Sequence, residues 1–312
     1  MPKPTKLAPF ALFVLFTAIV LFRHLYTTND NDTYMISNVV NGIYGPDNWC
    51  LFVNPLLSYG ISTFGKLFPM TDLFVVFRMG MCILGFAWMA FCFHRLFSNP
   101  RTEITADICL IIIEAYLNIS HSNFTVIAGW LACIGFISFL WFMEGRLGKS
   151  SLIVGSLMIT AGACIRVQGV FLVFPFFGLG TFVIIFHTLF DNRQNRHFKI
   201  INTIRALLGA AIPALIIGSL GLFNAHYTAT PERQNAIRYS IARAQMTDYD
   251  KRYDADADKL IPAGISRNDF QAIKWWILCD TELVNSNYLE ILSPARQSVN
   301  CKRTRTVFSG FA

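Results

Sequence analysis

The sequence predicts an all-α protein, built as a polytopic bundle of transmembrane helices. Of its 312 residues, 54% are hydrophobic and only 14% are charged, whereas a soluble domain carries about 25% charged residues. The mean hydropathy is +0.46. Windows of about 20 apolar residues, the length that crosses a bilayer, recur along the chain. Composition and recurrence together predict a multi-pass integral membrane protein.

About seven windows are long and apolar enough to be spans. In chain order they cover residues 8–26, 72–94, 104–120, 124–143, 150–165, 168–190 and 203–224. The first window has no small-residue cleavage site, so we interpret it as an uncleaved span rather than a signal peptide. The fifth is short and is separated from the sixth by Arg166 and Gln168. A tight hairpin and a partly re-entrant pair both fit this pattern.

Lys and Arg residues alternate between the connections in a way that predicts topology. If the N-terminus is cytoplasmic, the cytoplasmic segments contain Lys3, Lys6, Arg95, Arg101, Arg146, Lys149, Arg193, Arg196, Lys199 and Arg205. Cytoplasmic loops carry such an excess. The opposite side then contains the loop 27–71 and everything after about residue 225. Basic residues in the cytoplasmic connections explain part of the net charge of +7. No nucleic-acid-binding signature is found, so no nucleic-acid partner is predicted.

The first outer loop, residues 27–71, is predicted to contain two amphipathic helices at the membrane interface. Apolar residues at helical spacing indicate a helix over 33–41, with Asp32 as its N-cap and Gly42 as its stop. Asn54 followed by Pro55 predicts the start of a second helix, which Pro69 ends.

The chain is predicted to divide into the bundle, residues 1–225, and an extracytoplasmic helical tail, residues 226–312. Pro231 begins a polar helix in the tail, and Ser266 with Asp269 forms a capping box for another. The end of the tail is basic, has no helical period and is predicted to be irregular.

Charged residues inside the bundle or at its mouth are the candidates for function, because charge in a membrane is costly. The predicted outer ends carry Asp30, Asp32, Arg78, His121 and Arg166. A carboxylate can take a proton from an attacking hydroxyl, and arginine binds phosphate oxygens and stabilises a departing phosphate. We expect an outward-facing cavity with the two aspartates as catalytic residues and the other three binding the phosphate of an anionic, lipid-linked donor.

Each candidate has a purely structural alternative. Asp32 can act only as a helix cap, and Arg78 can extend to lipid headgroups. His121 can be an ordinary loop residue, and Glu114, within the third predicted span, can be a structural charge. Arg166 is the hardest to explain structurally, because it interrupts an apolar stretch and has no acidic residue near it in sequence.

The stretches NDNDTYMISNVVNG and NPLLSYGISTFGKLFP resemble the first outer loop of bacterial surface-polysaccharide members of the GT-C superfamily. These are polytopic glycosyltransferases that use polyprenyl-phosphate sugars. The resemblance covers roughly residues 8–225 and implies that Asp30 or Asp32, with Asp32 slightly favoured, is the catalytic base. It implies a plasma-membrane protein that transfers a sugar to a cell-surface glycan or lipid. The span count is below the family's usual number, which points to a shortened or truncated member.

Two other classes remain open from the sequence: a non-catalytic transporter or assembly factor for polysaccharide, and an inactive truncated member. A transporter is expected to contain internal repeats, and no convincing repeat is found. A G-x-S-x-G elbow, a P-loop and a dinucleotide fingerprint are all absent from the sequence. No cofactor is predicted, because two aspartates alone make a poor magnesium site and no CxxC pair suggests zinc.

Overall fold

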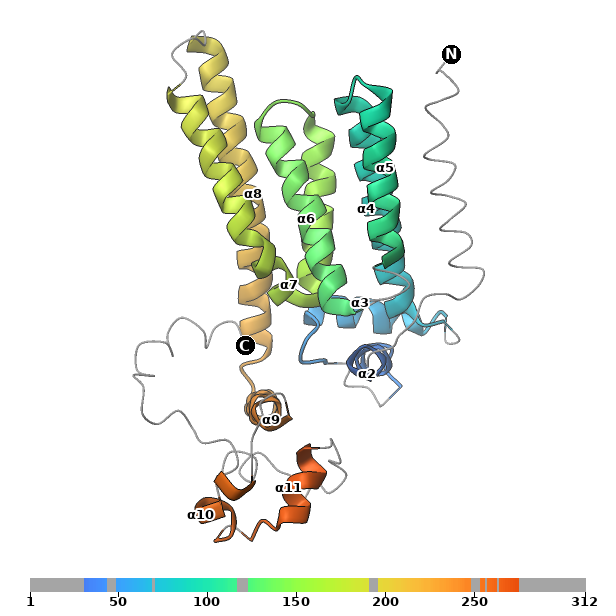
Figure 1. Ribbon diagram of the computed structural model, residues 1–312, viewed down its shortest axis with the longest axis vertical. Helices are drawn as coiled ribbons and strands as arrows, with labels where there is room; N and C mark the ends of the chain where they lie inside the picture. Colours follow the sequence, from blue (N-terminus) through green and yellow to red (C-terminus); the bar gives the residue numbers. More distant parts are fainter. Residues whose placement is uncertain are drawn as a thin grey trace. The chain divides into compact units, whose positions relative to one another are not determined.

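The computed structural model describes residues 31–43, 49–68, 71–116, 123–190, 196–247, 253–255, 257–262 and 264–274. The chain divides into two units, Met1–Leu220 and Gly221–Ala312, and each is described by itself. Within the described ranges every regular element is a helix and none is a strand, which confirms the all-α fold class (Figure 1).

Four helices are long and apolar enough to cross a membrane. They are α4 (Leu73–Leu96), α6 (Phe124–Met143), α7 (Lys149–Phe190) and α8 (Arg196–Tyr227). The prediction of a multi-pass membrane protein is confirmed at this level. A further helix, α5 (Pro100–Ala115), begins four residues before the predicted span 104–120. The predicted first span, residues 8–26, lies outside the described residues.

The helix α7 consists of two helices joined at Arg166, where the backbone is extended (φ −163°, ψ 109°). A straight helix of this length would reach about 63 Å, twice the thickness of a bilayer core. The chain instead reverses, because Gly162 lies against Ala128 of α6 and Gly169 lies against Gly129 of the same helix. The two halves of α7 therefore form a hairpin, and both pack on α6 (Figure 1). A tight hairpin of two spans and a partly re-entrant pair both fit this arrangement.

Small residues let α6 and α7 approach closely. A Cβ atom on Gly135 would lie 2.5 Å from Cγ1 of Ile159 and 2.9 Å from the carbonyl oxygen of Gly155. On the other half of α7, the ring of Phe177 stacks on Phe136 with centroids 4.4 Å apart. Helices in a membrane associate through this kind of close packing, since lipid tails are as apolar as the side chains.

The helix α4 packs on α6 through one glycine and one polar contact. A Cβ atom on Gly85 would lie 2.7 Å from Cδ1 of Ile134, so the two helices meet closely here. Near this point Nε1 of Trp88 donates a hydrogen bond to Oγ of Ser138 at 2.9 Å. A satisfied indole N–H is expected where tryptophan enters an apolar interface.

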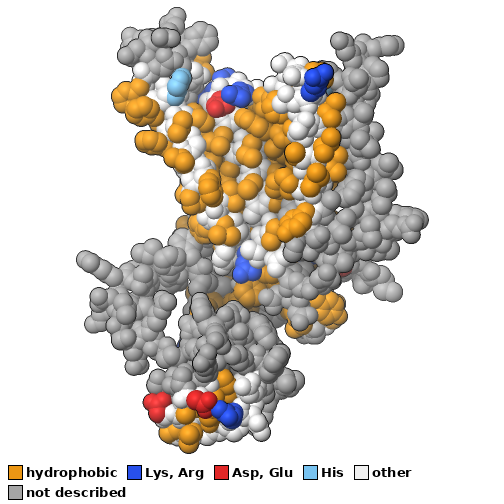
Figure 2. All heavy atoms as spheres, in the orientation of Figure 1, with side chains coloured by type: hydrophobic (Ala, Val, Ile, Leu, Met, Phe, Trp, Pro, Cys, Tyr) orange, Lys and Arg blue, Asp and Glu red, His pale blue; other side chains and the backbone are white. Residues whose placement is uncertain are grey.

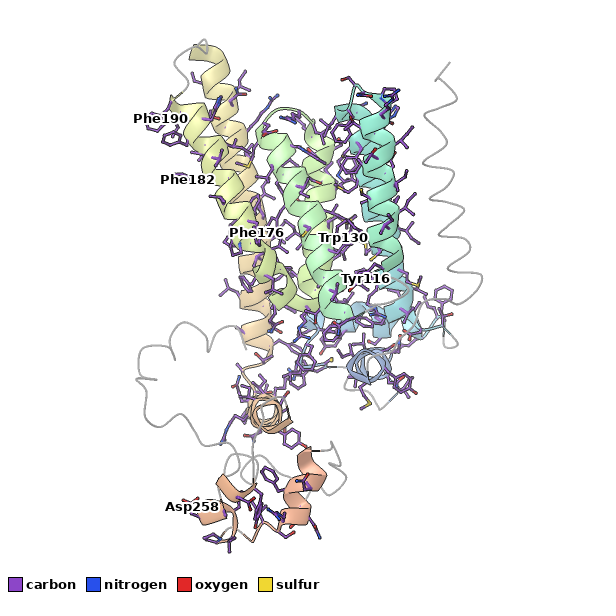
Figure 3. All side chains as sticks on the ribbon, in the orientation of Figure 1. Tyr116, Trp130, Phe176, Phe182, Phe190 and Asp258 are labelled. Carbon is purple, nitrogen blue, oxygen red and sulfur yellow. The ribbon has the colours of Figure 1, made fainter. Side chains whose placement is uncertain are left out.

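The outer surface of the long helices is apolar. Figure 2 shows hydrophobic side chains over the body of the described helices and charged side chains gathered near their ends. From the second half of α7, Phe176, Phe182 and Phe190 project away from α6 and are exposed (Figure 3). Such a surface suits contact with lipid tails and agrees with the membrane class.

The two helices predicted in the first outer loop are present as α2 (Asn31–Val40) and α3 (Pro55–Gly65). Gly42 has φ 80° and stops α2 as predicted. The N-cap prediction for Asp32 was wrong, because α2 begins at Asn31 and position 32 falls in its first turn. An acidic residue is favoured there by the helix dipole.

The second loop helix begins as predicted and ends earlier than predicted. Oδ1 of Asn54 accepts a hydrogen bond from the backbone N–H of Leu56 at 3.0 Å, and Pro55 is the first helical residue. The helix ends at Gly65 rather than at Pro69. Ile61 is buried against the bundle, whereas Leu56 and Phe64 are exposed, as is common for a helix at a membrane interface.

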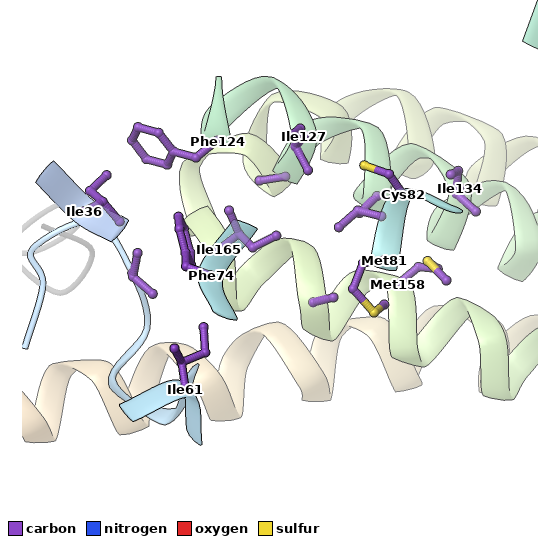
Figure 4. Packing of buried hydrophobic residues seen from close by; sticks show 14 of the residues in the cluster. Ile36, Ile61, Phe74, Met81, Cys82, Phe124, Ile127, Ile134, Met158 and Ile165 are labelled. Atoms are coloured by element: carbon purple, nitrogen blue, oxygen red, sulfur yellow. The ribbon is translucent and has the colours of Figure 1, made fainter. Parts of the chain in front are cut away.

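A single buried cluster joins the loop helices to the bundle. Figure 4 shows Ile36 of α2 and Ile61 of α3 in this cluster with Phe74, Phe124 and Ile165 from the long helices. The loop is therefore packed on the bundle and is not a free linker.

The second unit contains α9 (Pro231–Thr247), the short 3₁₀ helix η3 (Tyr253–Ala255), α10 (Ala257–Leu260) and α11 (Arg267–Lys274). Leu260, Ile265 and Phe270 are its most buried apolar residues. The predicted capping box of α11 is confirmed, because the backbone N–H of Ser266 donates to Asp269 Oδ2 at 2.9 Å and the N–H of Asp269 donates to Ser266 Oγ at 3.2 Å.

Substitution of Gly162 by Ala tests the close contact of α7 with α6. The new Cβ would lie 2.8 Å from the backbone oxygen of Ala128, so we expect Gly162→Ala to lower the free energy of unfolding by about 1–3 kcal/mol. Gly178→Ala is the matched control in the other half of α7, because its Cβ meets no atom within 4 Å. Thermal unfolding in detergent measures both variants, and an equal loss in the two would contradict the packing described here.

The capping box makes the stability of α11 depend on pH. Hydrogen bonding from the Ser266 side chain and then its backbone lowers the pKa of Asp269 below its ordinary value. The contribution of Asp269 to stability is therefore present above the pKa of the unfolded state. It is lost as pH falls through the lowered pKa of the folded state. We expect Asp269→Asn to speed amide hydrogen exchange in α11 at neutral pH but not at strongly acidic pH. Equal protection of the α11 amides in the wild type and in Asp269→Asn at neutral pH would contradict this role of Asp269.

Candidate functional site

The candidate site lies at the end of the first unit where the starts of α4 and α6 meet the break in α7. The loop before α3 closes this end, because the backbone N–H of Asn54 donates to the carbonyl oxygen of Cys164 at 2.8 Å. The Asn54 side chain also donates to the carbonyl oxygen of Leu220 in α8 at 3.3 Å. This end thus includes the starts of α4 and α6, the break in α7 and Leu220 of α8. The distribution of basic residues predicts that it faces away from the cytoplasm.

Arg166 is held at this end by two aromatic rings and a hydroxyl. Its Cζ atom lies 4.9 Å from the ring centroid of Phe52 and 4.7 Å from that of Phe124. Its Nη1 donates to Oγ1 of Thr125 at 2.8 Å. Cation–π contacts contribute about 2 kcal/mol where water is excluded, so this half-buried guanidinium is fixed in place. The extended backbone at the break sets the position from which the side chain reaches α6.

The first turn of α6 adds a second source of positive potential beside Arg166. Asn123 caps this helix by accepting a hydrogen bond from the N–H of Thr125 at 2.8 Å, and Thr125 is also the hydrogen-bond partner of Arg166. The N-terminal end of a helix carries a partial positive charge and favours anions. A guanidinium and a helix N-terminus together favour an anionic group such as a phosphate.

Arg78 is buried in α4, with only 2% of its surface exposed. Its Cζ atom lies 5.1 Å from the ring centroid of Phe74, one turn closer to the start of the helix. Helical side chains lean in this direction, so the guanidinium lies toward the same end as Arg166. The low exposure contradicts the alternative in which Arg78 extends to lipid headgroups. Phe74 and Phe124 belong to one buried cluster (Figure 4). Arg78 lies over the ring of Phe74, and Arg166 lies over the ring of Phe124.

The remaining predicted site residues are not placed by the structure. Asp30 and His121 lie outside the described residues, as does the side chain of Asp32, although its backbone is in the first turn of α2. The side chain of Glu114 is likewise not described. The structure therefore brings Arg78 and Arg166 to one end of the bundle, and the role of the aspartates stays a prediction.

Asp72 is a residue at this end that the sequence analysis missed. It caps α4, and its Oδ1 accepts hydrogen bonds from the N–H of Val75 at 3.0 Å and from Nδ2 of Asn41 at 2.9 Å. Oγ of Ser37 donates to its Oδ2. An aspartate directly before an apolar run is an N-cap signal, so the position was recognisable. Its contacts tie α2 to α4 and hold the loop against the bundle.

The described residues do not define a metal centre. Among them, no group of three His, Cys, Asp or Glu side chains is arranged to hold a metal ion. The chemistry that this end offers is recognition of an anion by arginine and backbone amides, beside a surface of apolar helices.

Comparison of the chain with models of known protein families, with curated proteins and with solved structures gives no match. The fold and site define the class: a multi-pass α-helical membrane protein with an arginine-containing end. The resemblance to GT-C glycosyltransferases stays a prediction.

Replacement of Arg166 tests whether this end binds a lipid phosphate. Hydrogen bonds to charged groups contribute about 1.5–3 kcal/mol, so Arg166→Gln is expected to weaken binding of a polyprenyl phosphate at least about tenfold. Arg166→Lys should weaken binding less, because it keeps the charge and loses the planar donors. Binding is measured with the purified chain in nanodiscs.

Arg95→Gln is the matched control for Arg166. Arg95 also stacks on a ring, with Cζ 5.1 Å from the centroid of Phe91, but it lies in the last turn of α4, away from the site. Its replacement should leave binding unchanged. Equal weakening in the Arg95 and Arg166 variants would show that binding follows net charge alone and would refute the site.

Proposed function

We propose that the protein is a membrane glycosyltransferase that transfers a sugar from a polyprenyl-phosphate donor to a glycan or lipid acceptor on the extracytoplasmic side. The observation that carries the proposal is Arg166, held between Phe52, Phe124 and Thr125 beside the start of α6. A polyprenyl-phosphate sugar needs a phosphate-binding group at the depth where headgroups meet hydrocarbon, and a broken helix at the end of a bundle supplies one.

The two arginines have separate roles in this proposal. Arg166 binds the donor phosphate, because its guanidinium is half-buried at the end of the bundle. Arg78 is fully buried in the adjacent wall and adds positive potential that stabilises charge on the departing polyprenyl phosphate. Charges act more strongly where water is excluded. This division explains why one arginine lies at a break in a helix and the other inside one.

The loop helices are suited to guide an amphipathic donor. In α2, Tyr34 and Met35 are exposed, and in α3 the same holds for Leu56 and Phe64. Ile36 and Ile61 of the same two helices are buried against the bundle. Helices with one face on protein and apolar side chains on another lie in the membrane interface, where the polyprenyl chain of the donor enters the hydrocarbon.

The proposal for the residue that activates the acceptor hydroxyl is based on the sequence. A carboxylate that follows the first span takes the proton of the attacking hydroxyl, and Asp32, with Asp30 as its neighbour, is the residue proposed for this step. Position 32 lies in the first turn of α2, and α2 packs on the cluster that underlies both arginines.

The aspartate proposal is tested by transfer and binding measured separately. We expect the double variant Asp30→Asn, Asp32→Asn to abolish sugar transfer in proteoliposomes, by at least about a hundredfold as for loss of a general base, and to retain donor binding. Asp258→Asn is the control, since that carboxylate is exposed on α10 (Figure 3). Unchanged transfer in the double variant would exclude both aspartates.

The same experiment distinguishes catalysis from transport or assembly. A wild-type chain that binds polyprenyl-phosphate sugars and moves or presents them without cleaving the sugar–phosphate bond would assign it to the non-catalytic class. A chain with no affinity for polyprenyl phosphates would overturn the proposal as a whole.

A further inference from the structure

We propose that His94, Glu103 and Asp107 form a proton-binding site at the other end of the first unit, where Asp107 takes up a proton between neutral and mildly acidic pH. The three residues lie in the last turn of α4 and the first turns of α5. This end is the one that the basic residues predict to be cytoplasmic. The inference does not depend on the proposed glycosyltransferase activity.

The geometry of the cluster is that of an imidazole paired with a buried carboxyl group. Nδ1 of His94 lies 2.7 Å from Oε1 of Glu103. Glu103 and Asp107 are four residues apart on α5 and so lie on one face of that helix. Their exposed fractions are 7% and 5%, and Leu110, on the same face, is also buried. This face of α5 is therefore its protein-facing side, and it carries two acids.

Asp107 is the residue of the cluster whose surroundings indicate a bound ligand. Its Oδ1 is buried and has no hydrogen-bond partner among the described residues. An ionised carboxylate in that position would lose its hydration without compensation, at several kcal/mol. A protonated carboxyl group is neutral and carries a donor of its own. The smallest ligand that removes this penalty is a proton.

The two acidic side chains of the cluster also disfavour a second negative charge. Glu103 and Asp107 lie four residues apart on one buried face, where two ionised carboxylates would repel each other. A proton on Asp107 removes this repulsion and leaves Glu103 as the partner of His94.

The nearby cations do not supply the missing charge. Arg95 is exposed and stacks on Phe91 of its own helix. Arg101 is exposed at the start of α5. In the part of the chain that the structure describes, neither guanidinium forms an ion pair with Glu103 or Asp107. Metal binding is not favoured either, since no described group of three acidic, His or Cys side chains is arranged for it.

A retained proton gives the contact between α4 and α5 a dependence on pH. As pH rises and the proton leaves, a buried negative charge develops between the two helices and weakens their packing. Ionisable groups inside membrane bundles commonly serve proton binding or relay. His94 is the most exposed member of the cluster, with its side chain 39% accessible, so it is the route by which the proton exchanges with water.

The proposal is tested by infrared spectroscopy of the full chain in nanodiscs, through the C=O stretching band of protonated carboxyl groups. At pH 6, about two units above the ordinary carboxyl pKa, the wild type should show this band and lose it on titration to alkaline pH. Asp107→Asn should lose the band at pH 6, because the carboxyl group that holds the proton is gone. Glu103→Gln should weaken the band, because it removes the repulsion that favours the proton on Asp107.

Glu144→Gln is the matched control, because Glu144 lies at the same end and pairs with Arg146 at 2.6 Å. Its replacement should leave the band unchanged. A wild-type spectrum without the band at pH 6, or a band that persists unchanged in both cluster variants, would overturn the proposal. If Asp107→Asn does not fold, the wild-type titration and Glu103→Gln decide the question.

Discussion

The break at Arg166 is the feature on which the rest of the first unit depends. A continuous helix would bond the carbonyl oxygen of Cys164 to the N–H of residue 168, four positions on. The extended backbone at Arg166 removes that bond, and in a membrane an unsatisfied carbonyl costs several kcal/mol. The backbone N–H of Asn54 supplies the replacement donor. The loop before α3 therefore satisfies the carbonyl group that the break in α7 would leave without a helical donor.

This hydrogen bond from Asn54 connects the loop before α3 to the helices of the bundle. Asn54 caps α3 with its side-chain oxygen and bonds α8 with its side-chain nitrogen, while its backbone serves α7. One residue thus joins three helices at the end where Arg166 lies. Phe52, two residues earlier, provides one of the rings under the guanidinium. The cap, the ring and the arginine therefore meet where the loop before α3 packs on the break in α7.

Hydropathy and turn chemistry predicted the parts of this structure that depend on local sequence. Long apolar runs gave α4 and α6, Asn54 with Pro55 gave the start of α3, and Arg166 marked the break in α7. The start of α2 was missed by two residues, because several polar residues precede it and each is an acceptable cap. Asp72 was missed because the apolar run that follows it was interpreted only as a span.

Other features depend on which helix faces meet, and a single sequence does not show this. In a membrane, apolar residues cover both the lipid-facing and the protein-facing sides, so the burial of Ile61 and the exposure of Phe64 have no separate signal. The pairing of His94 with Glu103 similarly follows from the packing of α4 on α5. Acids near the start of a helix are ordinary in sequence, and only their burial distinguishes Glu103 and Asp107.

Buried polar and charged groups are stabilised differently at the two ends of the first unit, and α4 contributes a residue at each end. Near its start, Arg78 keeps its charge and lies over the ring of Phe74, because a guanidinium does not lose its proton in a protein. Near its end, Nδ1 of His94 lies 2.7 Å from Oε1 of Glu103, so a polar partner offsets the burial of that carboxyl group. The two residues are about 24 Å apart along a helix that Trp88 and Gly85 hold against α6. The ring of Phe74 thus accompanies a charge that is fixed, whereas the contact with α5 brings together two side chains of titratable types.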